Sequence, residues 1–214
     1  RPTRDLDLLG YGPDDPEAVK RSVLRVLRVK CPEDGLRFDE GSLVVSAIRD
    51  DMTYGGVRAK FRAFLGNVRI PIQVDVGFGD AVTPAPEIRE FPVLLADLPA
   101  VSLQTYPVCT VVAEKFEAVV RLDAQNSRMK DFFDLDYLLQ DPALDRGQLA
   151  DAIRATFQRR GTELPNQVPT GLSDGFASDK RVMWNAFLRK NGLASGELAE
   201  VLTRIRRALE WTWK

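Results

Sequence analysis

Two runs of alternating apolar and polar residues, joined by Gly66-Asn67, limit what this chain can fold into more than any other feature. Residues 57–65 and 68–76 each place apolar side chains at every second position, which is the period of a strand with one buried face. A two-residue Gly-Asn connection between such runs is typical of a β-hairpin. The sequence therefore predicts a hairpin with one apolar and one polar face. The polar face carries Arg58, Lys60, Arg62, Arg69, Gln73 and Asp75.

Two acids, Asp5 and Asp7, stand one residue apart at the start of the chain and are followed by apolar residues. In a strand, both carboxylates point to one face, with their backbones about 7 Å apart. Asp75 lies on the polar face near the end of the predicted hairpin. If its strand lies beside the strand of Asp5 and Asp7, all three carboxylates face the same way. The alternative is that each acid is a solvated strand residue.

Three converging carboxylates could bind divalent metal cations. Mg²⁺ is a hard cation that binds carboxylate and phosphate oxygens. Two such cations, about 3.5–4 Å apart, clamp the attacking and leaving oxygens in phosphoryl and nucleotidyl transfer. Asp5, Asp7 and Asp75 are therefore candidate metal ligands of a transferase of this kind.

The absence of His from the 214 residues excludes Ser-His-Asp and Cys-His catalysis and His-ligated zinc. Acid–base or metal chemistry must then use carboxylates, Lys, Tyr or Cys. Cys31 and Cys109 imply no disulfide framework, and no apolar run of about 18 residues marks a membrane span. We expect a protein of a reducing cytoplasm. The net charge of −1 argues against a chain coated in positive charge for nucleic acid, but it is compatible with a local basic groove.

The remaining segments predict a first helix, two further strands and a helical C-terminal half. Asp15 and Pro16 are typical of the N-cap and first position of a helix, which we expect to run to about residue 29. Ser127 is a candidate N-cap of a later helix. We expect a strand at 43–49 and a long loop at 81–100 with a short edge strand at 93–95. Further helices are expected over about 111–123, after residue 127, and around 149–157, 182–187 and 198–209.

The last predicted helix is locally basic and is followed by two Trp residues. Arg204, Arg206 and Arg207 with Trp211 and Trp213 fit either of two interpretations. The Trp side chains pack against the fold and the Arg side chains are solvated, or the group forms a stacking and phosphate-binding surface for RNA. The basic residues of the first helix leave the same choice between a solvated face and an RNA contact.

Four stretches of the chain resemble the AbiEii/AbiGii type of nucleotidyltransferase toxin, a branch of the DNA polymerase β-like superfamily. They are similar to its R-x-[ST]-x-D-[IL]-D strand, its third-carboxylate strand, its E-K-x-x-A-x-x-x-R helix and its R-x-[KR]-D-[FY]-[YF]-D-[LI] segment. In this chain the four stretches are residues 1–8, residues 72–80, residues 113–118 with Arg121, and residues 128–135. The family's Gly-Gly-[ST] turn is not in the sequence. Because the chain has no initial Met, we expect further residues before Arg1.

The resemblance implies an α+β fold. We expect an N-terminal mixed-sheet nucleotidyltransferase core of the polymerase β-like type over residues 1–105. This core would lack its native N-terminal helix and the Gly-Gly-[ST] turn. A C-terminal helical bundle would follow over residues 106–214.

The resemblance also implies roles for individual residues. Asp5, Asp7 and Asp75 would hold the metal, and Asp75 would help to deprotonate an attacking hydroxyl. Lys115 would neutralise phosphate charge, and Asp131 would orient Lys115 or the nucleotide. The implied catalytic residues are Asp5, Asp7, Asp75, Lys115 and Asp131, and the implied nucleotide-binding residues are Thr3, Lys115, Arg128, Asp131 and Asp134.

By the same resemblance, the protein would be a nucleotidyltransferase that uses Mg²⁺ or Mn²⁺ and a nucleoside triphosphate (NTP). The acceptor in the family is RNA, at the 3′ end of tRNA. The protein would act in the bacterial cytoplasm as the toxin of a toxin–antitoxin or phage-defence system, with a cognate antitoxin and no membrane partner. Two alternatives stay open: transfer to a protein hydroxyl, and a catalytically silent module that binds a nucleotide or an antitoxin. Neither the base nor the oligomeric state can be read from the sequence.

Overall fold

The fold is of the α+β class and combines a four-stranded mixed sheet with a largely helical C-terminal part. A computed structural model describes residues 5–31, 34–48, 55–91, 93 and 98–213. The chain divides into two compact units, residues 1–80 and 81–214. The predicted division into a sheet domain of residues 1–105 and a helical domain of residues 106–214 stays a prediction. Within the described residues, no helix is long and apolar enough to cross a membrane.

The sheet of the first unit contains the predicted hairpin. Its strand order is β1-β4-β3-β2, with β1 parallel to β4 and the other neighbours antiparallel. Gly66 adopts φ +56° in the turn, a backbone conformation that glycine reaches at little cost. The fourth strand, β2, is longer than the predicted 43–49, because its first half also pairs with β3 beyond an irregularity between Asp39 and Val44. The strand bounds are β1 (Leu6–Gly10), β2 (Leu36–Ile48), β3 (Gly56–Leu65) and β4 (Val68–Phe78).

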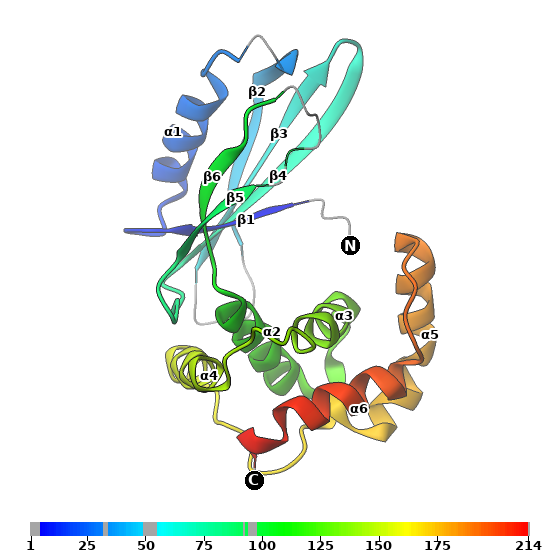
Figure 1. Cartoon of the computed structure of the whole chain (residues 1–214). Helices are drawn as coiled ribbons and strands as arrows, with labels where there is room; N and C mark the ends of the chain where they lie inside the picture. The colour runs from blue at the N-terminus through cyan, green and yellow to red at the C-terminus, as the bar shows by residue number, and fades with distance from the viewer. Residues whose placement is uncertain (1–4, 32–33, 49–54, 92, 94–97, 214) are drawn as a thin grey trace. The chain divides into compact units, whose positions relative to one another are not determined.

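One face of this sheet is covered by helix α1 (Pro16–Leu27), which runs beside the strands in Figure 1. The predicted N-cap is confirmed, since the Asp15 carboxylate accepts hydrogen bonds from the backbone N–H groups of the second and third helical residues, both at 3.0 Å. Buried Leu27 packs with Ala59, Phe61 and Val74 of the sheet. Because side chains alternate along a strand, the neighbours of these apolar residues point to the opposite face.

The second unit begins with a small sheet that the sequence did not predict. Strands β5 (Glu87–Phe91) and β6 (Val101–Thr105) pair antiparallel. Residues 81–100 were expected to form a loop, because their many Pro and acidic residues disfavour strands. Pairing with β6 outweighs that composition. The edge strand expected at 93–95 is not found at Val93, which lies in no regular element, and its other two residues lie outside the described residues.

In the described residues of the second unit, five α-helices and three short 3₁₀ turns predominate, and they pack around one apolar cluster. The largest fully buried side chains in this cluster belong to Trp184, Phe116, Phe132 and Phe157. The helices are α2 (Val108–Leu122), α3 (Met129–Leu138), α4 (Arg146–Arg160), α5 (Asp174–Asn191) and α6 (Leu198–Leu209). The 3₁₀ turns are η2 (Asp123–Gln125), η3 (Thr170–Leu172) and η4 (Glu210–Thr212).

Packing within this unit bears on two predictions, the N-cap at Ser127 and the environment of the C-terminal Trp residues. Helix α3 begins after Arg128, and Ser127 does not cap it. The reason is buried Asn126, whose side chain accepts from the Arg128 N–H at 2.8 Å and starts the helix one residue later than expected. At the C-terminus, Trp211 and Trp213 pack against the apolar cluster, which favours the packing interpretation over a stacking surface for RNA.

Candidate active site

The acids predicted to converge do so at the edge of the first sheet. In the parallel pair β1–β4, Asp7 lies directly opposite Asp75. Asp5 directly precedes β1, two residues before Asp7. One oxygen from each of the three carboxylates lies within 4.8 Å of the others. We call Asp5, Asp7 and Asp75 the acid triad.

The acid triad fits a divalent cation on chemical grounds. Three carboxylates at this separation repel one another unless positive charge offsets them. All ligand atoms are hard oxygens, which suit Mg²⁺ or Mn²⁺ and not a soft metal. Asp7 is exposed, whereas Asp5 and Asp75 are partly buried, so the group opens to solvent on one side. A substrate phosphate can therefore complete the coordination of a cation held here.

The sequence analysis missed one member of this site, Arg58 on β3. Its Nε and one terminal nitrogen donate hydrogen bonds of 2.7 Å to the two carboxylate oxygens of Asp75. Gln73 donates a further bond to Asp75 Oδ2, at 3.2 Å. The signal was present in the sequence: a two-residue turn at Gly66-Asn67 fixes the hairpin register, and counting outward from the turn places Arg58 opposite Asp75.

A second charged cluster lies in the second unit, where Lys115 of α2 meets the acids of α3. Its Nζ lies 3.0 Å from Asp131 Oδ1 and 2.9 Å from Asp134 Oδ2. Asp131 is fully buried, and the side chain of Lys115 is 16% exposed. The amine is therefore fixed by two carboxylates, while part of the Lys115 side chain stays accessible. Lys115 thus contacts both acids, and the roles predicted for the three residues stay predictions.

Arg128 completes the charged cluster from the residue before α3. Its Nε lies 2.7 Å from Asp131 Oδ2, an ion pair without the alignment of a hydrogen bond. Burying a carboxylate is costly unless it is paired, and Asp131 has a cation at each oxygen. Thr3, the other predicted nucleotide contact, lies outside the described residues.

A buried carboxylate that the sequence analysis did not single out connects α2 to α4. Glu117 is fully buried, and it accepts hydrogen bonds from Arg121, Arg160 and Thr162 at 2.7–2.9 Å. It lies two residues after Lys115 on the same helix. The Glu–Arg spacing of four was a weak signal for one of these pairs. The contacts hold α2 against the end of α4 and thereby support the helix that carries Lys115.

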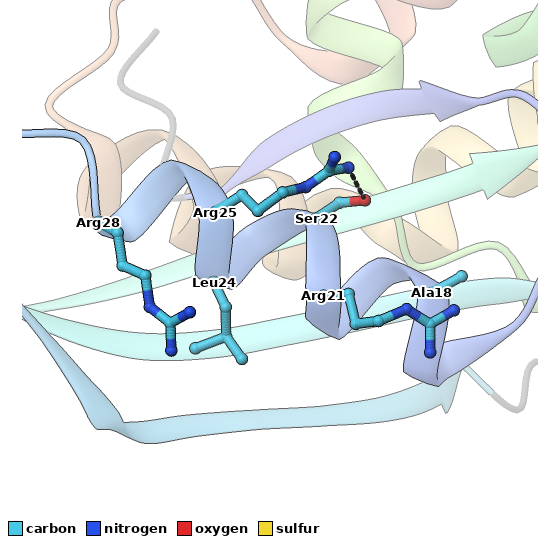
Figure 2. Close-up of a pocket in the computed structure, with 6 residues that line it drawn as sticks. All are labelled: Ala18, Arg21, Ser22, Leu24, Arg25 and Arg28. Atoms are coloured by element: carbon cyan, nitrogen blue, oxygen red, sulfur yellow. Dashed lines mark hydrogen bonds between the residues drawn. The ribbon is translucent and has the colours of Figure 1, made fainter.

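A hollow of about 510 Å³ on α1 is separate from the acid triad. Figure 2 shows that Arg21, Arg25 and Arg28 extend along it, with Arg25 donating a 3.3 Å bond to Ser22. Arg28 also bonds Glu40 at 2.8 Å. Helix α1 packs on the apolar face of the sheet, whereas the acid triad lies on the opposite face. This basic surface therefore does not line the triad.

Three carboxylates suited to a divalent cation are a group that nucleotidyl transfer uses, and they fit the class of nucleotidyltransferases. The family model described as the nucleotidyl transferase AbiEii toxin of type IV toxin–antitoxin systems matches residues 1–211, and the chain belongs to this family. This confirms the predicted resemblance and identifies the protein as an enzyme. No curated protein and no solved structure matches the chain.

Proposed function

We propose that this protein transfers a nucleotide from an NTP to a hydroxyl group of RNA, with the 3′ end of tRNA as the expected acceptor. The reaction depends on Mg²⁺ or Mn²⁺ held by Asp5, Asp7 and Asp75. The protein acts as the toxin of a toxin–antitoxin or phage-defence system and is held in check by a cognate antitoxin. The observation that carries the proposal is the convergence of the three carboxylates within 4.8 Å.

In the proposed reaction, the oxygen of the acceptor hydroxyl attacks the α-phosphorus of the NTP. A new P–O bond forms, the bond from the α-phosphorus to the α–β bridging oxygen breaks, and pyrophosphate leaves. Bound divalent cations would neutralise triphosphate charge and align the attacking and leaving oxygens. The hydroxyl proton passes to Asp75, a carboxylate that its hydrogen bonds already orient.

Lys115 is assigned to the phosphate charge that develops during transfer. A compact ammonium group suits this role, because it can stand close to a phosphate oxygen. Its bonds to Asp131 and Asp134 fix it before substrate arrives. Arg128 supports Asp131 and is the second candidate contact of the nucleotide.

Exposed basic side chains on the sheet face of the acid triad favour an RNA acceptor over a protein hydroxyl. Lys60 and Arg69 are exposed on the same face as Asp75. In the part of the chain that the structure describes, no carboxylate forms an ion pair with Lys60 or Arg69. Unpaired cations on the sheet face that carries a transfer site attract the phosphates of a nucleic acid and add little for a neutral protein hydroxyl.

The proposal can be tested by offering the two acceptors separately. The intact protein is incubated with Mn²⁺, with each of the four α-³²P-labelled NTPs in turn, and with either total RNA or total protein. Label in the RNA fraction, lost in Asp75→Asn, is the expected result. Label in the protein fraction alone would favour the alternative acceptor, and no transfer to either fraction would favour a silent binding module.

A further inference from the structure

Arg58 binds both oxygens of one carboxylate of the acid triad. Its guanidinium meets the Asp75 carboxylate as two parallel hydrogen bonds of 2.7 Å, the geometry of the strongest Arg–carboxylate pairs. The two residues stand directly opposite each other in the β3–β4 register. The side chain of Asp75 is only 14% exposed, whereas that of Arg58 is 36% exposed.

Both oxygens of one triad carboxylate are thus already bonded to a positive charge. A cation that approaches the triad must share Asp75 with Arg58 or displace it. Each carboxylate oxygen has two lone pairs, so sharing is possible, but the positive guanidinium repels the incoming cation. The two carboxylates of Asp5 and Asp7 then provide most of the attraction.

We propose that Arg58 is a positioning residue that aims Asp75 and also acts as the resident counter-ion of the acid triad. By offsetting one negative charge, it weakens the binding of a free divalent cation. A cation that arrives with an NTP brings the negative charge of the triphosphate with it, which compensates for the guanidinium. Arg58 thereby makes loading of the metal site depend on the nucleotide.

This assignment predicts that two properties move in opposite directions in Arg58→Gln. Loss of the positive charge tightens Mn²⁺ binding without nucleotide by about 5- to 10-fold. Loss of the paired hydrogen bonds lowers turnover with saturating NTP and Mn²⁺ by about 10- to 100-fold, as is usual for groups that orient a metal ligand. A residue that only stabilised the fold would weaken both.

Arg58→Lys separates charge from geometry, because it keeps the charge but cannot form the paired bonds. The Mn²⁺ affinity of Arg58→Lys should stay within about twofold of that of the intact protein, a change in binding free energy smaller than one hydrogen bond contributes. Its turnover should still fall. Arg62→Gln is the matched control. Arg62 lies on the same strand and face, and pairs with Asp39 at 2.9 Å instead of with the triad.

The experiment is a titration of Mn²⁺ into the full chain, followed by electron paramagnetic resonance of the free ion, with and without NTP. Thermal unfolding of each variant checks that the fold is retained. Tighter Mn²⁺ binding in Arg58→Gln, with Arg62→Gln unchanged, supports the assignment. Unchanged or weaker binding in Arg58→Gln, or equal tightening in Arg58→Lys, overturns it.

The nucleotide part of this proposal rests on the proposed function. The Mn²⁺ titration needs no turnover, so its result and the result of the transfer assay are independent. If Arg58→Gln binds Mn²⁺ more tightly but the intact protein transfers nothing to RNA or protein, the counter-ion assignment stands and the proposed function falls. If the intact protein transfers nucleotide and Arg58→Gln does not bind Mn²⁺ more tightly, the proposed function stands and the counter-ion assignment falls.

Discussion

Asp7 stands directly opposite Asp75 across the parallel pair of β1 and β4. The two carboxylates come from segments almost seventy residues apart, and this pairing brings them together. Among the strands that the structure describes, β1 lies at the edge of its sheet and pairs with β4 alone. The candidate metal site therefore depends on how tightly a five-residue edge strand is held.

Gly10→Ala tests this dependence. Gly10 pairs with Phe78 at the end of β1, and a Cβ atom at Gly10 would lie 2.3 Å from the Phe78 ring. Replacing Gly by Ala usually stabilises a protein through its unfolded state. Here we expect a loss of about 1–3 kcal/mol in the free energy of unfolding, because the new methyl group overpacks the contact. Urea unfolding and Mn²⁺ titration should both show the loss.

Gly41→Ala is the control for that substitution, since a Cβ atom there would meet nothing closer than 3.5 Å. We expect its unfolding free energy and its Mn²⁺ affinity to match those of the intact protein. Full stability and full metal affinity in Gly10→Ala would show that β1 tolerates displacement and that the triad does not depend on this contact.

Lys115→Met removes the amine that bonds Asp131 and Asp134 while keeping most of the length of the side chain. We expect transfer to fall by at least about 100-fold, the usual cost of removing a group that stabilises developing charge. Single-turnover measurements with saturating NTP report this step. Exposed Lys190→Met, near the end of α5, should leave the rate unchanged. A loss below threefold in Lys115→Met would exclude a role in the transfer step.

The hairpin and the position of Asp75 in it could be predicted because their signals are local. Alternation along residues 57–76 and the turn at Gly66-Asn67 determine both the face and the register of Asp75. The placement of Asp5 and Asp7 beside it required one assumption, a strand next to β4, and the structure confirms it. The triad is the part of the site where local pattern and tertiary structure agree.

The rest of the fold depends on contacts between distant residues, which a pattern in the chain does not encode. Strand β5 exists because Glu87 pairs with Thr105, although its sequence is rich in charge. The start of α3 is set by the buried side chain of Asn126, which overrides the better cap at Ser127. Each exception follows from packing that outweighs local propensity.

Glu117→Gln should be the most destabilising change near the charged cluster. It leaves the guanidinium groups of Arg121 and Arg160 without their buried carboxylate. We expect the free energy of unfolding to fall by about 3 kcal/mol, as when one partner of a buried ion pair is removed. Urea unfolding measures the loss. Asp151→Asn breaks an exposed pair with Arg154 in the same unit and should cost less than about 0.5 kcal/mol.

The two cysteines should differ in their reaction with iodoacetamide at pH 8. Cys31 is exposed, whereas Cys109 is buried in the core of the second unit. Burial raises the pKa of the Cys109 thiol, and the nearby carboxylate of Asp145 raises it further. Since the thiolate is the reactive species, a higher pKa leaves less of it at a given pH. Mass spectrometry should find Cys31 alkylated and Cys109 unmodified until urea unfolds the protein.

The raised pKa of Cys109 also makes the free energy of unfolding depend on pH. The folded protein keeps the thiol proton to a higher pH than the unfolded chain does. Its contribution to stability is therefore fully present below the thiol pKa of the unfolded chain and declines as pH rises above that value. Rapid alkylation of Cys109 in the folded protein would contradict both statements.

The most direct test of the acid triad is calorimetric titration of Mn²⁺, in the presence of a non-hydrolysable NTP analogue, into the intact protein and into Asp7→Asn. We predict saturable binding by the intact protein and an affinity at least about tenfold lower in Asp7→Asn, equal to about 1.4 kcal/mol. Asp179→Asn, an exposed acid on α5, should bind as the intact protein does. Equal binding by the intact protein and Asp7→Asn would contradict the account.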